Sequence, residues 1–175
     1  MRRLYLPLLF LAFALFLAAS GAHADILQGK ITGIADGDTV YVTDSSQREY
    51  KIRLLGIDTP EYQQPYGEAA KQALKKLAHQ QFAKIEWQHR DQYGRLLGKV
   101  TLANGQDIGL AQLRAGLAWW NKKFSYEQTG ADAILYREAE FAARKQRSGL
   151  WSQQNPMPPW RWRYANRQQP DTVKP

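Results

Sequence analysis

The order of hydrophobic patterns along the chain predicts an α+β fold, a small antiparallel barrel of five strands with three helices. Apolar and polar residues alternate between residues 26 and 57, the pattern changes to helical spacing over 67–78, and two further alternating segments precede two more helical ones. Five antiparallel strands with a helix inserted after the third are the arrangement of an OB-fold, which often binds nucleic acid on one face.

Turn residues separate the predicted strands. Asp36-Gly37 lies between the first two, and this dipeptide favours a two-residue hairpin whose central residues have positive φ. Asp44-Ser-Ser-Gln47 marks the turn before the third strand. The fourth and fifth strands are expected over 82–89 and 95–102, where apolar residues again occupy every second position.

Helical spacing of apolar residues predicts three helices. The first covers 67–78, with lysines on its polar surface. Asp107 is placed to cap the second, over 108–115, because an aspartate side chain can accept hydrogen bonds from the first free N–H groups of a helix. The third is expected over 131–147. The prolines that follow, between 156 and 159, predict that no further helix forms.

The N-terminal segment has the features of a secretory signal peptide. Arg2 and Arg3 precede an apolar run that ends at Ala19, and Ala22-His-Ala24 offers small residues at alternate positions for cleavage. The apolar run is short for a membrane span. We therefore expect residues 1–24 to be removed after Ala24 and the protein to be secreted or periplasmic, with no membrane span in its mature form. An uncleaved N-terminal anchor, Met1 to Ala19, is the alternative.

The mature chain is expected to form one domain over 25–151, followed by a tail over 152–175 that is rich in proline, aromatic and basic residues. We expect a monomer. The chain has no cysteine and a formal net charge of +8, which stays positive when the two N-terminal arginines are removed. Anionic partners such as nucleic acid are therefore indicated, although basic charge alone does not identify them.

Two carboxylates are expected at the ends of neighbouring strands. Asp38 opens the second strand and Asp58 follows the third. Thr59 precedes a proline, which extends its backbone and can turn its carbonyl toward the same position. Three protein oxygens suit Ca²⁺, and no His or Cys lies near these segments to suit zinc. For Asp36-Gly-Asp38 alone, the alternative is ordinary turn chemistry without a metal.

Two arginines and one further acid complete a possible phosphodiesterase site. Arg53 lies on the strand face opposite its apolar neighbours, and Arg95 starts the fifth strand, so both are candidates for binding phosphate as its charge grows in a transition state. Glu61 follows Pro60 and could orient or deprotonate a water molecule. Taken singly, the arginines are equally explained by surface ion pairs and Glu61 by an exposed loop.

Several segments of the chain together resemble the thermonuclease family, and they cover nearly all of the mature chain up to Trp151. They are Asp36-Gly-Asp-Thr-Val40, Ile52-Arg-Leu-Leu-Gly-Ile-Asp-Thr-Pro-Glu61, Tyr66-Gly-Glu-Ala-Ala70, Asp91-Gln-Tyr-Gly-Arg95, Gly116-Leu-Ala118 and Gly149-Leu-Trp151.

The resemblance implies a role for each candidate residue. Asp38, Asp58 and the Thr59 carbonyl would hold Ca²⁺, Arg53 and Arg95 would bind the scissile phosphate, Glu61 would assist the attacking water, and Tyr93 would contact the substrate. It also implies cleavage of DNA and RNA that leaves 3′-phosphorylated ends. The loop between Glu61 and Tyr66 is shorter than in the staphylococcal pattern, and 119–126 replaces a tyrosine-bearing stretch.

Three functional hypotheses follow from the sequence. The first is an exported calcium-dependent nuclease. The second is a non-catalytic OB-fold module that holds nucleic acid through its basic surface and aromatic tail, and the third is a structural protein anchored by its N-terminus. In the tail, Trp160 and Trp162 are expected to pack against the domain, while Trp119, Trp120, Phe124 and Tyr126 could either stack on bases or close the core.

Overall fold

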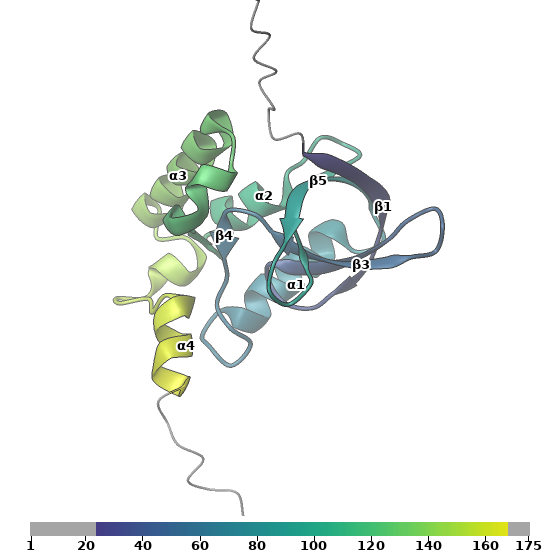
Figure 1. Ribbon diagram of the computed structural model, residues 1–175. Coiled ribbons are helices and arrows are strands. Elements are labelled where there is room, and N and C mark those ends of the chain that lie inside the picture. The colour runs from purple at the N-terminus through teal and green to yellow at the C-terminus, as the bar shows by residue number, and fades with distance from the viewer. Residues whose placement is uncertain (1–23, 168–175) are drawn as a thin grey trace, which may run out of the picture.

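Five strands close into a barrel in the computed structural model, which describes residues 24–167 (Figure 1). The predicted signal peptide, except Ala24, and residues 168–175 of the tail lie outside the described residues. Around the barrel the strands are β1 (Asp25–Ile34), β2 (Thr39–Thr43), β3 (Glu49–Leu54), β6 (Leu96–Leu102) and β5 (Phe82–Arg90). The strands β4 (Ile57–Asp58) and β7 (Trp119–Trp120) form a separate antiparallel pair. The predicted α+β barrel is confirmed.

The barrel closes through a parallel pair of strands, which the sequence analysis did not predict. β3 and β6 run in parallel, with Ile52 opposite Leu96 and Arg53 opposite Leu97, whereas the other neighbouring strands of the barrel are antiparallel. The helix α1 (Gly67–Ala78) and β5 lie between β3 and β6 in the chain, and a parallel pair requires a long connection of this kind. Tight turns alone indicated only the antiparallel pairs.

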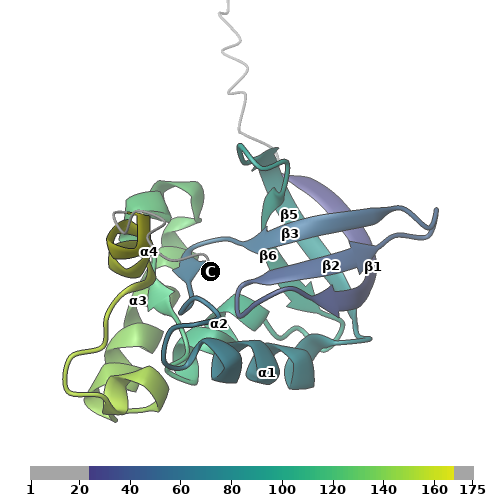
Figure 2. The ribbon, with the colours of Figure 1, turned by 90° about the horizontal axis from the view of Figure 1, so that it is seen from below.

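The three predicted helices are present within one or two residues of their expected bounds, as α1, α2 (Ile108–Arg114) and α3 (Gly130–Lys145). Asp107 Oδ1 accepts from the N–H groups of Gly109 and Leu110 and so caps α2 as expected. Short 3₁₀ helices, η1 (Lys122–Glu127) and η2 (Gly149–Ser152), flank α3. In two perpendicular views α3 and the C-terminal helix α4 (Pro159–Arg167) lie on the same side of the barrel (Figures 1 and 2).

The prediction that no helix follows the prolines is wrong, because α4 (Pro159–Arg167) begins at the last of them. Proline lacks an N–H and has a fixed φ, and neither property disturbs the first turn of a helix. Within residues 24–167, no helix combines the length and the apolar character needed to cross a membrane.

Apolar side chains from the strands fill the barrel and meet the inner faces of α1 and α2. This core includes Ile31, Val40, Val42, Ile52, Ile85, Val100, Leu74 and Leu113. A second cluster lies where β7, α3 and η2 meet, and it contains Trp119, Ala143, Leu150 and Trp151. The second cluster attaches the chain after α3 to the side of the barrel that carries β4.

The loop between β1 and β2 differs from the predicted two-residue hairpin. Ile34 pairs with Val40, so the loop is longer, and Gly37 does not adopt a positive φ. Glycine is required there by crowding instead, since a Cβ atom on Gly37 would lie 2.7 Å from both Ala70 Cβ and Thr59 Oγ1. Gln112 of α2 fixes the same loop, because its Nε2 donates to the carbonyls of Gly37 (2.7 Å) and Ala70 (2.8 Å).

We expect Gln112→Ala to lower the free energy of unfolding by about 2–4 kcal/mol, because it removes the side-chain hydrogen bonds to the Gly37 and Ala70 carbonyls and opens a cavity. Urea denaturation followed by circular dichroism measures the loss. Gln72→Ala, on the exposed face of α1, is the matched control and should cost less than about 0.5 kcal/mol. Equal losses in the two variants would contradict this role for Gln112.

Candidate active site

The structure brings the two predicted metal ligands together. Asp38 and Asp58 are almost completely buried, with 5% and 2% of their surfaces exposed. Arg53 Nη2 lies 3.1 Å from Asp38 Oδ2 and 3.0 Å from Asp58 Oδ1. Two carboxylates from different strand ends therefore converge on one guanidinium nitrogen.

Backbone carbonyls hold Arg53 in this position. Its Nη1 donates to the carbonyl of Leu54 at 3.0 Å and to that of Ile57 at 2.9 Å. These carbonyls belong to the turn that leads from β3 into β4, so the path of the chain here fixes the guanidinium group. A planar group with both terminal nitrogens bonded has little freedom to rotate, which gives the carboxylates a rigid partner.

Thr59 contacts Asp38 through its donor groups. Its N–H and its Oγ1 donate to Asp38 Oδ2 at 2.8 Å and 3.0 Å. The residue is buried between the loop before β2 and the end of β4, which brings its backbone next to Asp38. The predicted use of the Thr59 carbonyl as a metal ligand remains a prediction.

A third arginine, which the sequence analysis missed, reaches the site from α4. Arg163 Nη2 lies 2.7 Å from Asp58 Oδ2, and its Nη1 donates to Glu61 Oε1 at 2.6 Å. Burial of Arg163 lowers its pKa, but the hydrogen bonds and charges of the two acids outweigh this and raise it. Glu61 joins the site through this arginine. The carbonyl of Met157, just before α4, accepts a hydrogen bond from Gln64 Nε2. This bond connects the segment that leads into α4 with the loop after Glu61.

One sequence signal could have indicated Arg163. The helix Pro159–Arg167 carries three arginines and no acid, which favours an acidic partner, and the catalytic candidates are acids. Its position could not be inferred, since Asp58 lies 105 residues earlier in the chain.

Arg95 and Tyr93 lie on the neighbouring hairpin and contact each other rather than the buried acids. Arg95 Nε donates to Asp91 Oδ2 at 2.7 Å, and its guanidinium lies 5.5 Å from the centre of the Tyr93 ring, which is on a residue that is 74% exposed. Arg95 directly precedes Leu96, the partner of Ile52 in the parallel pair. By this register Arg95 lies beside β3 on the same outward face as Arg53, although no contact joins it to Asp38 or Asp58 within residues 24–167.

Burial and like charge shift the pKa values of the acids at this site. Burial, together with repulsion from Asp38, raises the pKa of Asp58, although the hydrogen bond from Arg163 and the charge of Arg53 act to lower it. Burial, followed by repulsion from Asp38, raises the pKa of Asp36 to about 6. For Asp91, burial is outweighed by hydrogen bonds from Arg95, so its pKa is lowered. Burial therefore disfavours the charged form of Asp36 and Asp58, whereas hydrogen bonds from Arg95 favour the charged form of Asp91.

The donor set fits a hard divalent cation. Carboxylate and carbonyl oxygens are the ligands that Ca²⁺ prefers, and Asp38 and Asp58 already converge in a buried position. No group of three or more His, Cys, Asp or Glu side chains that could hold a metal gathers anywhere in the described part of the chain. With the predicted Thr59 carbonyl, the protein's share of the coordination would be two carboxylates and one carbonyl, and water would complete the shell.

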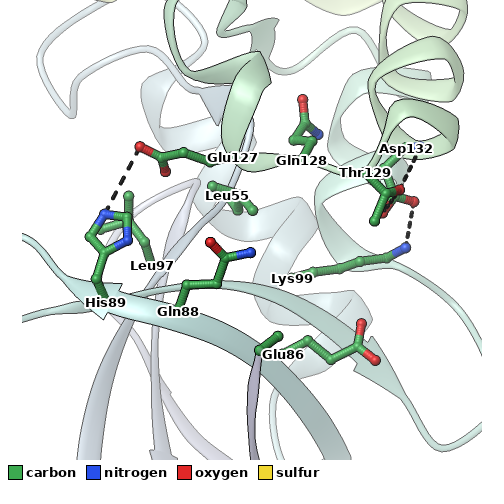
Figure 3. A pocket seen from close by; sticks show the side chains of 11 residues that line it. Leu55, Glu86, Gln88, His89, Leu97, Lys99, Glu127, Gln128, Thr129 and Asp132 are labelled. Carbon is green, nitrogen blue, oxygen red and sulfur yellow. Dashed lines mark hydrogen bonds and ion pairs between the residues drawn. The ribbon is translucent and has the colours of Figure 1, made fainter. Parts of the chain in front are cut away.

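A small pocket of about 80 Å³ elsewhere on the barrel is not part of this site (Figure 3). It lies between β5, β6 and the segment that leads into α3. His89 Nε2 lies 3.9 Å from Glu127 Oε1, and Lys99 Nζ lies 2.5 Å from Asp132 Oδ1 (Figure 3). None of the predicted site residues lines this pocket. Its ion pairs attach η1 and α3 to the barrel.

We expect Asp36→Asn to stabilise the protein by about 1–3 kcal/mol near pH 7.5, measured by urea denaturation with chelator present. The raised pKa of Asp36 means that the folded wild type binds this proton more tightly than the unfolded chain. Protonated Asp36 contributes fully to the free energy of unfolding below about pH 4, and this contribution is lost as the pH rises through about 6. Asparagine can still accept the bond from the Asp38 N–H, which is 3.0 Å long.

The advantage of Asp36→Asn over wild type should therefore grow between pH 4 and pH 7. Asp44→Asn is the control, because the hydrogen bond from the Arg48 N–H, the largest of several causes, lowers the pKa of Asp44 and the variant should show no such gain. A difference between Asp36→Asn and wild type that is independent of pH would contradict the prediction.

Comparison with known proteins identifies the family of this chain. A family model described as staphylococcal nuclease homologue matches residues 51–153. An uncharacterized endonuclease from Escherichia coli O157:H7 is 36% identical over 162 residues, which is 93% of this chain and 98% of that protein. A micrococcal nuclease from Shigella flexneri is 37% identical, covering 83% of this chain and 85% of its own. This chain belongs to the staphylococcal nuclease family.

Proposed function

We propose that this protein is an exported, Ca²⁺-dependent nuclease that hydrolyses the phosphodiester bonds of DNA and RNA and leaves 3′-phosphorylated products. The observation that carries the proposal is the convergence of Asp38 and Asp58 on one nitrogen of Arg53. Membership of the family supports phosphodiester cleavage. The basic charge of the chain supports a nucleic-acid substrate, and its N-terminal sequence supports export.

Each residue of the site has a distinct part in the proposed reaction. Asp38, Asp58 and the Thr59 carbonyl hold the cation. Bound there, Ca²⁺ supplies Lewis acidity toward a phosphate oxygen or a water molecule. Glu61 accepts the proton of the attacking water. Arg53 and Arg95 donate to phosphate oxygens whose negative charge grows in the transition state.

The two arginines must exchange partners in order to bind phosphate, and Arg53 must release Asp38 or Asp58 from its Nη2. Arg95 must turn from Asp91, its present partner at 2.7 Å, toward the phosphate. Glu61 binds Arg163 through Oε1, which leaves Oε2 to accept a proton. Tyr93, exposed beside Arg95, is placed to contact the substrate at the same edge of the barrel.

We expect Asp58→Asn and Arg95→Gln each to lower the rate of single-stranded DNA digestion by at least about 10²-fold, since the first removes a ligand of the cation and the second removes a donor to the transition-state charge. Initial rates with Ca²⁺ and with chelator, together with analysis of the product 3′ ends, measure the effect. Arg48→Gln, an exposed arginine away from the site, is the control and should digest as the wild type does. Chelator-resistant digestion would overturn the mechanism, and metal-independent binding without cleavage would favour the non-catalytic module.

We expect Arg163→Gln to bind Ca²⁺ about tenfold more tightly than wild type in calorimetric titrations without substrate. The reason is that the cation and the guanidinium compete for Asp58, and a tenfold change corresponds to about 1.4 kcal/mol. Arg161→Gln removes the same charge from an exposed position on the same helix and should leave the affinity unchanged. Weaker binding by Arg163→Gln would show that this arginine supports the cation site instead.

A further inference from the structure

A cleft of about 990 Å³ opens directly beside the catalytic candidates. One wall consists of β7 and the start of η1, and the other consists of α4 and the segment that precedes it. Asp58 and Arg163 line the cleft as well, so it is continuous with the site described above. We call it the aromatic–basic cleft and define it by Trp119, Trp120, Lys122, Lys123, Trp160 and Arg161.

The cleft carries positive charge that the protein does not neutralise. Its acids are already paired, Asp58 with two arginines and Glu140 with Arg144 at 3.0 Å. Lys122, Lys123 and Arg161 are exposed and form no ion pair with any other described residue. A surface with three unpaired cations beside a phosphodiesterase site favours a ligand that carries several negative charges.

Fixed indole rings line the same cleft. Trp160 is 45% exposed, and one edge of its ring meets the buried Trp119 at 6.4 Å between ring centres. Trp120 is partly exposed, and its Nε1 donates to Gln128 Oε1 at 3.0 Å, which sets the direction of the ring. Lys122 Nζ lies over this ring, 5.8 Å from its centre, so a base that stacks there takes the place of Lys122. Indoles that are anchored on one side and open on the other are suitable platforms for flat aromatic ligands.

Bases, rather than acidic side chains, explain the two features together. Each nucleotide of a nucleic-acid strand carries a phosphate and a flat base. This composition matches the cations and indoles that line the cleft. The base must be free to stack on protein, and bases in a duplex are already stacked on each other. The combination therefore favours a single strand over a double one.

We infer that the aromatic–basic cleft binds the single-stranded segment of nucleic acid next to the scissile phosphate. Trp160 and Trp120 stack on bases, and Lys122, Lys123 and Arg161 contact phosphates. The inference rests on the proposed nuclease function and adds to it substrate-binding residues from α4, which lie beyond the matched span 51–153.

Equilibrium binding of a fluorescent thymidine oligonucleotide to the full mature chain, with chelator present to prevent cleavage, tests the inference. Trp160→Ala should weaken binding by about five- to a hundredfold, the range for loss of one base–aromatic stack. The double variant Lys122→Gln/Lys123→Gln should lower the slope of log K against log salt by about 1.4, which is about 0.7 for each lost phosphate contact with a single strand. Melting temperatures establish that both variants fold.

Matched controls distinguish binding in the aromatic–basic cleft from general electrostatic attraction between DNA and a basic protein. Lys75→Gln/Lys76→Gln removes the same charge from exposed positions on α1, and it should leave the slope close to that of wild type. A duplex of equal length should bind more weakly than the single strand, and Trp160→Ala should leave duplex binding unchanged. Equal effects of the two lysine pairs, no effect of Trp160→Ala, or an equal loss for duplex would each overturn the inference.

The outcomes also distinguish this inference from the proposed function. If the wild type digests DNA with Ca²⁺ and the cleft variants bind as the wild type does, only the inference fails. If the wild type binds single strands through the cleft but does not digest them, only the proposed function fails. Displacement of the oligonucleotide by polyglutamate from wild type but not from Trp160→Ala would identify an acidic peptide as the occupant and overturn the inference.

Discussion

Two like charges buried side by side are the constraint on which the rest of this structure depends. Asp38 and Asp58 repel each other, and removing a carboxylate from water carries a large free-energy cost unless a cation compensates for it. Arg53 supplies one cation from β3, and Arg163 supplies another from α4. The barrel, the short β4–β7 pair and the C-terminal helix are thereby joined at one point, and that point is the candidate active site.

Local patterns in the sequence predicted much of the fold. Alternation and helical spacing placed the barrel strands and three helices, and Asp107 was recognised as a cap because its partners are only two and three residues away. The proximity of the two acids could also be predicted, since Asp38 directly precedes β2 and Asp58 follows β3, its neighbour in the sheet. The structure brings them together on Arg53, as their positions at strand ends suggested.

The features that the sequence did not predict depend on contacts between distant segments. Gly37 carried the signal of a tight turn, but it is glycine because Ala70 and Thr59 pack against it. Arg163 acts on an acid 105 residues earlier. The helix that carries Arg163 was excluded because prolines precede it, although Pro159 occupies the one turn of a helix where proline is acceptable. None of these relations leaves a periodic pattern in the chain.

The parallel pairing of β3 with β6 has a consequence for when the enzyme can first act. Arg53 and Arg95 come to lie on adjacent strands only when β3 pairs with β6. This pairing needs α1 and β5 to be in place, because β6 is the last barrel strand along the chain. Contacts between distant segments form late, since the entropy of closing the loop must be overcome first. A nascent or partly folded chain thus has its acids and its arginines but no assembled site. The proposed site is therefore complete only in the folded chain, although each of its side chains is present from synthesis onward.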